Sequence, residues 1–316
     1  MISILQLVEE NLVNKAKNNN RDYSYFHASE WEKCHRKIAY EYYEAKKLIE
    51  TDDSALKISP QLERIFDCGH YMHDRWRSYL EQTGALLGVW KCSNLAHKVI
   101  LRKKIKDNGG KLANNDDRSE EDYLDGVFGK KHKLGILRPE KCDCGCTSFE
   151  YHEVGFYDEE TMWGGHVDSI LDVGLLDKEA KEDEKKIAVG FSAFPPKDWG
   201  LNKVVIDFKT MNPYKFAKLT EPLPEHKTQM QIYLYLSGLK YGKFIYEDKA
   251  LQGVKEFLIV RDDNLLEVKI DQAKRLKFIV THENKNGSRV LPKRAYSSRA
   301  HEECLRCKYR ANCWKV

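Results

Sequence analysis

The sequence lacks any long apolar run, and none of its stretches approaches the roughly 20 consecutive apolar residues that a membrane-spanning helix needs. Its first residues, MISILQLVEENLVNKAK, also lack the basic start and the cleavage site of a signal peptide, and they are more typical of an amphipathic helix. We therefore expect an intracellular, cytoplasmic protein with no membrane association. If a phage encodes it, that cytoplasm is the host's.

The chain also lacks a strong charge of either sign. Of its 316 residues, 53 are basic and 49 are acidic, which gives a net charge of +4. This balance does not identify a nucleic-acid partner, so a phosphate-binding surface would have to come from local clusters of basic residues. A solvated charged face is the simpler explanation for each cluster taken alone. The clusters are Lys98–Lys106, Lys130–Lys133 and Lys285–Arg299.

Internal repeats are absent from the sequence as well. A composition of 41% hydrophobic and 32% charged residues is typical of a globular protein, and the length allows a sizeable core. We predict a single domain, residues 1–316, with insertions at 88–156 and 177–203. The second insertion has a charged first half followed by Pro195-Pro196, a pattern that favours a long exposed loop or flap.

Cysteine, by contrast, is plentiful. Nine cysteines without a secretion signal argue against a disulfide framework and favour metal or cluster binding. Cys304, Cys307 and Cys313 follow a C-x-x-C and then a C-x5-C spacing, and with the distant Cys34 they supply four soft ligands. Such a set suits an iron–sulfur cubane or zinc, and the spacing alone does not decide between them. Cys68 is expected to be an ordinary buried thiol.

A second group of cysteines lies in the segment RPEKCDCGCTSFEYHEVGF, residues 138–156. Three thiols stand within five residues of one another: Cys142, Cys144 and Cys146. A C-x-C-G turn followed by a strand is similar to half of a zinc ribbon, and a fourth ligand could come from Cys92, His97 or His152. Free thiols on a surface loop are the alternative, although they would invite oxidation. We predict a zinc knob formed by four residues: Cys92, Cys142, Cys144 and Cys146.

The stretch Trp163–Leu236 organises the chain. GGHVDSILDVG and VVIDFKT have strand patterns, and EHKTQMQIYLYLSG has a helix pattern with one apolar face. Each strand carries a carboxylate, Asp168 or Asp207. Because side chains alternate across a strand, Asp207 and Lys209 point to the same side of the sheet. Two carboxylates and a lysine at one place can hold a divalent metal and orient a phosphate.

Four motifs in this order resemble the PD-(D/E)xK nuclease superfamily, in the form found in RecB-type nuclease domains. GHVD at 165–168 is similar to the family's G-h-x-D strand, and DFK at 207–209 to its (D/E)-x-K motif. Gln229 and Tyr233 match the following Q-x-x-x-Y helix, and residues 69–73 match an upstream G-x-x-x-H helix. A D-x-K motif alone occurs by chance, whereas four motifs in order are a strong signal.

The resemblance implies an α/β fold with a restriction-endonuclease-like core, a mixed central β-sheet flanked by helices. It implies four ligands for Mg²⁺ or Mn²⁺: His73, Asp168, Asp207 and the backbone carbonyl of Phe208. Lys209 would orient the attacking water or stabilise the developing oxyanion, which makes His73, Asp168, Asp207 and Lys209 the expected catalytic residues. Gln229 and Tyr233 would contact the substrate and support the lysine.

The cysteines extend the resemblance. Cys34 lies in an S-x-x-x-x-C-x-R-K pattern, and together with the C-terminal triad it is similar to the iron–sulfur nucleases of the CRISPR-associated adaptation family and to AddB-type nuclease domains. The resemblance favours a [4Fe–4S] cluster over zinc, held by Cys34, Cys304, Cys307 and Cys313. Segments 27–48 and 300–316 would then be joined as a staple that closes nearly the whole chain.

These features predict a metal-dependent DNA nuclease, an exonuclease acting on single strands or duplex ends. The alternative is a nucleic-acid-binding or protein-interaction module that keeps the cluster and has a vestigial nuclease site. A redox sensor is a third reading. The residue types at the catalytic positions favour the enzyme. Some relatives assemble into rings, so oligomerisation is left open.

The remaining elements are predicted from periodicity. Segment 27–48 predicts a helix in which Ser29 is the N-cap and Glu32 completes a capping box. Segment 58–84 predicts a helix that ends at Gly84. After residue 238 we expect strands at 243–248 and 255–263, and a strand followed by a helix within 266–285.

Overall fold

The computed structural model describes residues 21–49, 59–94, 134–176, 203–282 and 289–314, together with residues 4, 8, 9 and 11–13. The insertion 177–203, apart from Lys203, lies outside the described residues, as do His97 and the basic clusters Lys98–Lys106 and Lys130–Lys133. The elements are β1 (Phe26–His27), a 3-10 turn (Ala28–Glu30), α2 (His35–Ala45), α3 (Pro60–Gln82), β2 (Leu86–Cys92), β3 (Ile136–Leu137), β4 (Phe149–His152), β5 (Val154–Asp158), β6 (Trp163–Val167), β7 (Ser169–Asp172), α6 (Val173–Leu176), β8 (Lys203–Met211), α8 (Pro213–Lys218), α9 (Pro224–Ser237), β9 (Tyr241–Asp248), β10 (Val254–Val260), α10 (Asp263–Thr281), α11 (Glu302–Leu305) and α12 (Arg310–Trp314).

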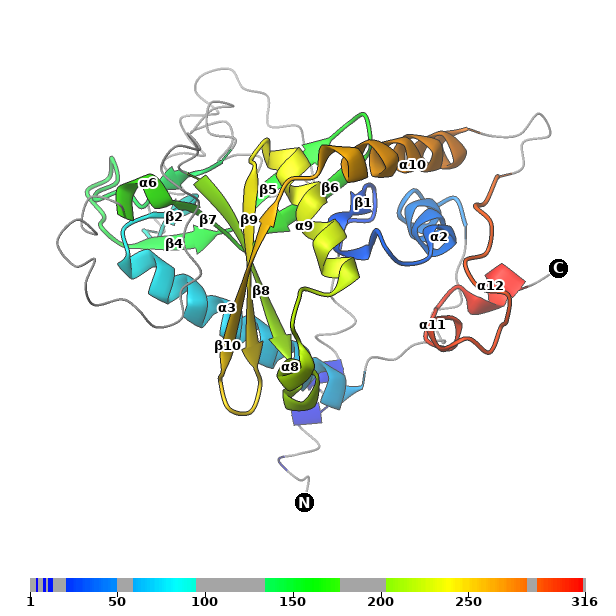
Figure 1. Ribbon diagram of the computed structural model, residues 1–316, viewed down its shortest axis with the longest axis horizontal. Helices are drawn as coiled ribbons and strands as arrows, with labels where there is room; N and C mark the ends of the chain where they lie inside the picture. The colour runs from blue at the N-terminus through cyan, green and yellow to red at the C-terminus, as the bar shows by residue number, and fades with distance from the viewer. Residues whose placement is uncertain are drawn as a thin grey trace.

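A mixed sheet forms the centre of the molecule (Figure 1). Its strands run in the order β10-β9-β8-β7-β2-β3, and β4 pairs with β2. The β8–β9 pair is parallel and is connected through α8 and α9, whereas the other pairs in this sheet are antiparallel. A smaller sheet has the order β1-β6-β5. The predicted α/β class with a mixed central sheet and flanking helices is confirmed.

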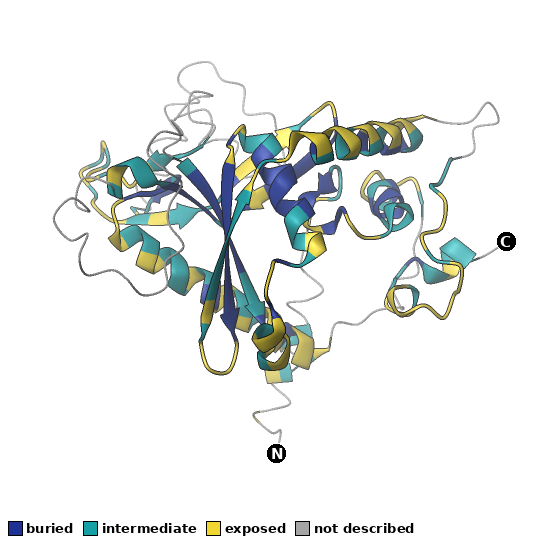
Figure 2. Cartoon of the chain, in the orientation of Figure 1, coloured by how far each residue is buried: buried dark blue, intermediate teal, exposed yellow. Residues whose placement is uncertain are grey.

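Each face of the sheet is covered by different helices. On one face Met72, Trp76 and Leu80, spaced four residues apart on α3, pack with Ile206 and Phe208 of β8. On the other face Val205 of β8 packs in a cluster with residues of α9, α10 and α2. Since neighbouring residues of β8 point to opposite faces, this strand is buried on both sides, as Figure 2 shows. The continuous apolar run Val204–Ile206 reflects that burial.

Helix boundaries follow local chemistry. Ser59 caps α3 by accepting a hydrogen bond from the backbone N–H of Leu62 at 3.2 Å, and Pro60 occupies the first turn. The chain leaves this helix through Gly84, whose φ is 70°, as the sequence predicts. Helix α9 likewise begins at Pro224 and is capped by Gly238 at φ 72°. None of the helices in the described ranges is long and apolar enough to cross a membrane.

Two predictions about the N-terminal third are wrong. Ser29 accepts a hydrogen bond from the Arg21 side chain instead of capping a helix, and α2 begins only at His35, with Cys34 as its N-cap residue. The neighbouring Glu30 is buried and forms ion pairs with Lys33 and Lys37, and the segment Ala28–Glu30 forms a 3-10 turn. Cys68 is exposed on α3 rather than buried.

The predicted strand within 266–285 is also wrong, because one helix, α10, spans Asp263–Thr281. Asp262 caps it by accepting a hydrogen bond from the backbone N–H of Leu265 at 3.0 Å. Leu266, Ala273 and Val280 are buried at intervals of seven residues. This spacing suits one helical face, and it outweighs the β-branched residues that suggested a strand.

Gly88 of β2 gives a test of packing in the central sheet. A methyl group at Gly88 would collide with the ring of Tyr151, which packs edge-on against Trp90. We expect Gly88→Ala to lower the free energy of unfolding by about 1–3 kcal/mol, because a packed core does not accept the added volume. Gly69→Ala is the matched control: nothing lies within 4 Å of its added methyl group, and it lies inside α3. It should be neutral or stabilise by about 0.5–1 kcal/mol. Denaturant unfolding of both variants measures the difference, and equal values would contradict this packing.

Candidate functional site

Two carboxylates on different strands lie next to each other. Asp168 lies between β6 and β7, and Asp207 lies in β8. The antiparallel register of β7 and β8 opposes Ser169 to Ile206, so Asp168 lies beside the Asp207–Phe208 peptide. The backbone N–H of Phe208 donates a hydrogen bond to Oδ2 of Asp168 at 2.7 Å. The sheet therefore brings together two acidic residues that are far apart in the sequence.

Helix α3 adds an imidazole to this pair. Nδ1 of His73 lies 3.3 Å from Oδ1 of Asp168, and the His73 ring packs against Phe208 with 5.7 Å between ring centroids. Burial acts to lower the pKa of His73, but its hydrogen bond with Asp168 and the acidic charges nearby raise the pKa above its ordinary value. Burial acts to raise the pKa of Asp168, but the same hydrogen bond and the nearby positive charges hold that pKa below its usual range.

Asp207 is a buried carboxylate without a hydrogen-bond donor. Its side chain is 2% exposed, and within the described ranges neither oxygen accepts a hydrogen bond. Nζ of Lys209 lies 2.7 Å from Oδ1 and forms an ion pair with it. Burial raises the pKa of the Asp207 carboxyl to about 7, against the opposing effect of Lys209. A buried carboxylate left in this way is costly unless it has a further partner.

A chain of polar contacts leads from Lys209 to α9. Nζ of Lys209 donates a hydrogen bond to Oε1 of Gln229 at 3.0 Å, and Nε2 of Gln229 donates to the hydroxyl of Tyr233 at 3.1 Å. Gln229 and Tyr233 are both buried. Gln229 therefore fixes the direction of the ammonium, and Tyr233 fixes the amide. The structure brings Gln229 into contact with Lys209 and Tyr233 into contact with Gln229, as their spacing on one helix face allows.

Sequence reasoning missed Glu153, which follows β4. Glu153, His73 and Asp168 each place one ligand atom within 4.8 Å of the others. Asp207 is adjacent but does not belong to that tight group. Burial and the charge of Asp168 raise the pKa of Glu153 to about 7, although Arg77 opposes this rise. One signal was present in the sequence: Glu153 continues the alternation of Phe149 and Tyr151, so an acid stands where an inward-facing residue is expected.

Arg77 and Tyr151 form hydrogen bonds and an ion pair with the residues of this group. Arg77 forms an ion pair with Glu153 and donates through Nε to the backbone carbonyl of Asp168 at 3.3 Å. The hydroxyl of Tyr151 donates to the same carbonyl, also at 3.3 Å. Imidazole nitrogen and carboxylate oxygens suit Mg²⁺ or Mn²⁺, and a cation would give the buried Asp207 carboxylate a second positive partner beside Lys209. The residues present therefore fit a divalent metal.

The cysteines fall into two separate places. One cavity is lined by all four of the residues predicted to hold a cluster: Cys34, Cys304, Cys307 and Cys313. Basic residues line the same cavity, among them Lys33, Lys37 and Arg310. The zinc-knob thiols gather elsewhere, at the end of the β2–β4 ladder, where Sγ of Cys92 lies 3.6 Å from Sγ of Cys144.

Polar and aromatic contacts attach the C-terminal tail to α2. Glu44 of α2 accepts hydrogen bonds from Lys308 and Tyr309, and the Tyr309 ring stacks on Tyr40 with 5.2 Å between centroids. Arg36 donates to the backbone carbonyl of Pro292 at 3.0 Å. The cavity lined by the four cysteines therefore lies where α2 meets the C-terminal tail, and these hydrogen bonds and the ring contact hold the two segments together.

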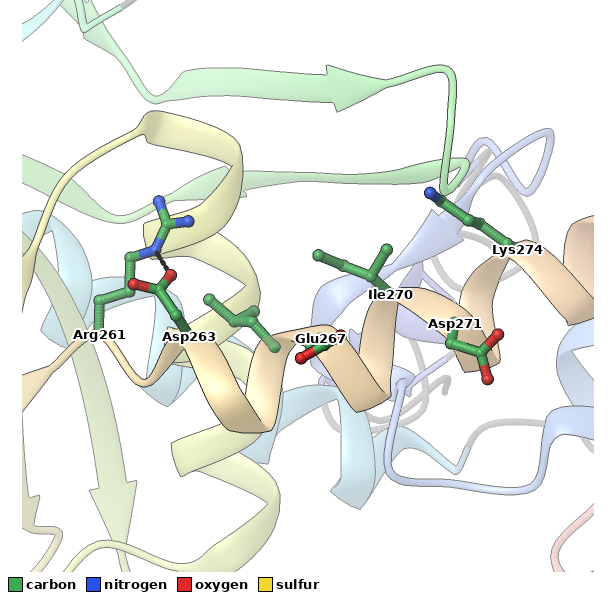
Figure 3. A pocket seen from close by; sticks show the side chains of 7 residues that line it. Arg261, Asp263, Glu267, Ile270, Asp271 and Lys274 are labelled. Atoms are coloured by element: carbon green, nitrogen blue, oxygen red, sulfur yellow. Dashed lines mark hydrogen bonds and ion pairs between the residues drawn. The ribbon is translucent and has the colours of Figure 1, made fainter.

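A surface hollow of about 320 Å³ lies along α10 (Figure 3). Its lining mixes charges of both signs, and Arg261 forms an ion pair with Asp263 at 2.7 Å across the start of the helix. None of its lining residues belongs to the carboxylate site or to either cysteine group. The hollow is therefore distinct from the three candidate sites.

No family model matches the sequence, and no curated protein matches it. Among solved structures, that of SSO0001 is similar over 98% of this chain and 95% of that chain, with 16% identity and a TM-score of 0.40. An alkaline exonuclease, LHK-Exo from Laribacter hongkongensis, is similar over 41% of this chain and 58% of its own, with 20% identity and a TM-score of 0.28. Its complex with dAMP is similar over 82% and 89%, with 13% identity and a TM-score of 0.38.

Proposed function

We propose that this protein is a metal-dependent nuclease that hydrolyses phosphodiester bonds of DNA, acting as an exonuclease on single strands or duplex ends. The observation that carries the proposal is the buried Asp207 carboxylate. It has no hydrogen-bond donor within the described residues, it adjoins Asp168 and His73, and Lys209 lies at 2.7 Å. Burying a carboxylate that has one ion pair and no hydrogen-bond donor costs stability, so a functional role is the better explanation for this group.

In this proposal His73, Asp168, Asp207 and the backbone carbonyl of Phe208 hold Mg²⁺ or Mn²⁺, with Glu153 as a further ligand or a support for His73. The bound cation lowers the pKa of a water molecule and offsets the charge that develops on the phosphate.

The chain's own residues would then set the geometry of hydrolysis. Gln229 holds the ammonium of Lys209 through the 3.0 Å hydrogen bond, so that it can orient the attacking water or the phosphate oxygens. The Phe208 N–H fixes Oδ2 of Asp168 and leaves Oδ1 directed to His73. Gln229 and Tyr233 are proposed to contact the substrate from α9.

We also propose that Cys34, Cys304, Cys307 and Cys313 hold a [4Fe–4S] cluster. Four thiolates lining one cavity with lysine and arginine residues suit an anionic thiolate cofactor. The choice of a cluster over zinc follows the family resemblance of these four cysteines.

The direct test of the proposed activity uses end-labelled DNA. Purified anaerobically, the protein should shorten labelled single strands or duplex ends in Mn²⁺ or Mg²⁺, and chelation with EDTA should stop the reaction. Substrates with a blocked 5′ or 3′ end would show the polarity. No cleavage in either metal, from protein with its iron intact, would instead favour a binding module with a vestigial site.

Glu153 provides a second prediction. Glu153→Gln keeps the shape of the side chain but removes the charge shared with Arg77, so we expect kcat to fall by about 10- to 100-fold, the range typical when a ligand or its support is lost. Glu150→Gln is the matched control, since Glu150 lies on the same strand with a side chain that is 66% exposed. Initial cleavage rates at saturating Mn²⁺ measure the effect. Equal rates in the two variants would remove Glu153 from the site.

A further inference from the structure

We infer that Cys92, Cys142, Cys144 and Cys146 form a second metal centre, a structural zinc site that fixes the β2–β4 ladder independently of the nuclease site. Cys92 is the last residue of β2, and the three other cysteines lie on the turn that leads into β4. The ladder pairs Cys92 with Phe149, so this turn folds back onto the end of β2.

Sulfur positions suit a single tetrahedral ion. Sγ of Cys92 lies 3.6 Å from Sγ of Cys144, and the sulfurs of Cys92, Cys142 and Cys144 lie within 4.8 Å of one another. Tetrahedral zinc places its thiolates about 3.8 Å apart, whereas a disulfide requires about 2.05 Å. Cys92 also interacts with the Cys146 thiol. Three thiols are therefore gathered near zinc spacing, Cys146 lies beside them, and none of the four is in a disulfide.

The backbone around the thiols supports the same conclusion. Two sulfurs accept a hydrogen bond from the N–H two residues later: Asn94 donates to Cys92 at 3.5 Å, and Ser148 donates to Cys146 at 3.4 Å. Such donors stabilise thiolates that bind a metal. The turn between the other two cysteines is closed by the Gly145 N–H, which donates to the Cys142 carbonyl at 2.8 Å. Gly145 has φ 86°, which favours glycine at this position.

The zinc site would hold β4 in place. Tyr151, within this strand, and Glu153, just after it, both reach the carboxylate site. Tyr151 of β4 donates to the Asp168 carbonyl, and Glu153 follows the strand and joins His73 and Asp168. Losing the ion should free the end of the ladder and displace both residues. This consequence for catalysis rests on the proposed nuclease function, whereas the zinc site does not.

The test is a metal count on the full-length protein and its variants, purified anaerobically and analysed by mass spectrometry for zinc and iron. We expect about one zinc per chain in the wild type. Cys144→Ser should lower zinc at least tenfold and keep iron, and Cys304→Ser should lower iron and keep zinc. Cys68→Ser, which replaces an exposed thiol on α3, is the control and should keep both. Zinc that persists in Cys144→Ser, or iron that disappears with it, would overturn the assignment.

If Cys144→Ser does not fold, metal exchange in the wild-type protein still tests the zinc site. Cobalt exchanged into the zinc site should give the intense thiolate-to-metal absorption of a tetrahedral cysteine site, and a protein that takes up no cobalt or zinc would refute the proposal. DNA cleavage is measured separately on the same samples. A zinc site confirmed in an inactive protein would contradict the nuclease proposal alone, and an active protein without zinc would contradict the zinc proposal alone.

Discussion

Replacing Lys209 with alanine should reduce metal-dependent DNA cleavage by about a thousandfold, because it removes the ammonium that Gln229 directs toward the carboxylates. Asp207→Asn should have an effect of similar size, because an amide is a poor substitute for an anionic metal ligand. Initial rates on end-labelled DNA at saturating Mn²⁺ measure both. Lys203→Ala is the control, since Lys203 lies at the start of the same strand and on the same side by alternation.

The same variants distinguish catalysis from structure through stability. Without metal, the buried Asp207 carboxylate lacks a hydrogen-bond donor within the described residues. Removing its charge should therefore leave the metal-free melting temperature unchanged or raise it, while activity is lost. Full cleavage by both Asp207→Asn and Lys209→Ala would rule out the proposed site. A folded state lost in Asp207→Asn would assign that carboxylate a structural role instead.

Removing the proposed cluster should have the largest effect on stability. Cys307→Ser takes away one of the four thiolates that line the cavity between α2 and the C-terminal tail. Because binding of such a cofactor contributes directly to folding, we expect iron to be lost and the melting temperature to fall by on the order of 10 °C. The contacts of Glu44 with Lys308 and Tyr309 should keep part of the junction folded. Iron content and thermal unfolding under anaerobic conditions measure the result.

Cys68→Ser is again the control for this change, because its thiol is exposed and lines neither cysteine site. It should match the wild type in iron content and in melting temperature. A Cys307→Ser variant that kept its iron would contradict the ligand assignment. One that lost its iron without any loss of stability would contradict the stapling role of the cluster.

The elements that carry the site could be predicted because their signals are local. A buried strand with Asp207 and Lys209 two residues apart fixes both side chains on one side, whatever the sheet order. The helix pattern with Gln229 and Tyr233 four apart fixes their common face. The mixed sheet itself followed from the family resemblance of these motifs and not from periodicity, and the parallel pairing of β8 with β9 is seen only in the structure.

Contacts between segments that are far apart in the sequence could not be predicted from local patterns. Glu153 reaches His73 and Asp168 only because β4 pairs with β2, and that pairing joins strands separated by more than fifty residues, Trp90 with Tyr151 for example. The strand predicted at the start of 266–285 failed for another reason. β-branched residues there favour a strand locally, but burial of one face against α9 and α2 selects the helix.

We propose that one divalent ion binds among His73, Asp168 and Asp207, and anomalous diffraction from crystals soaked in Mn²⁺ would locate it. We expect one manganese peak within coordination distance of these three side chains, absent from crystals of Asp207→Ala. Manganese bound only elsewhere, or no peak at a saturating concentration, would contradict it.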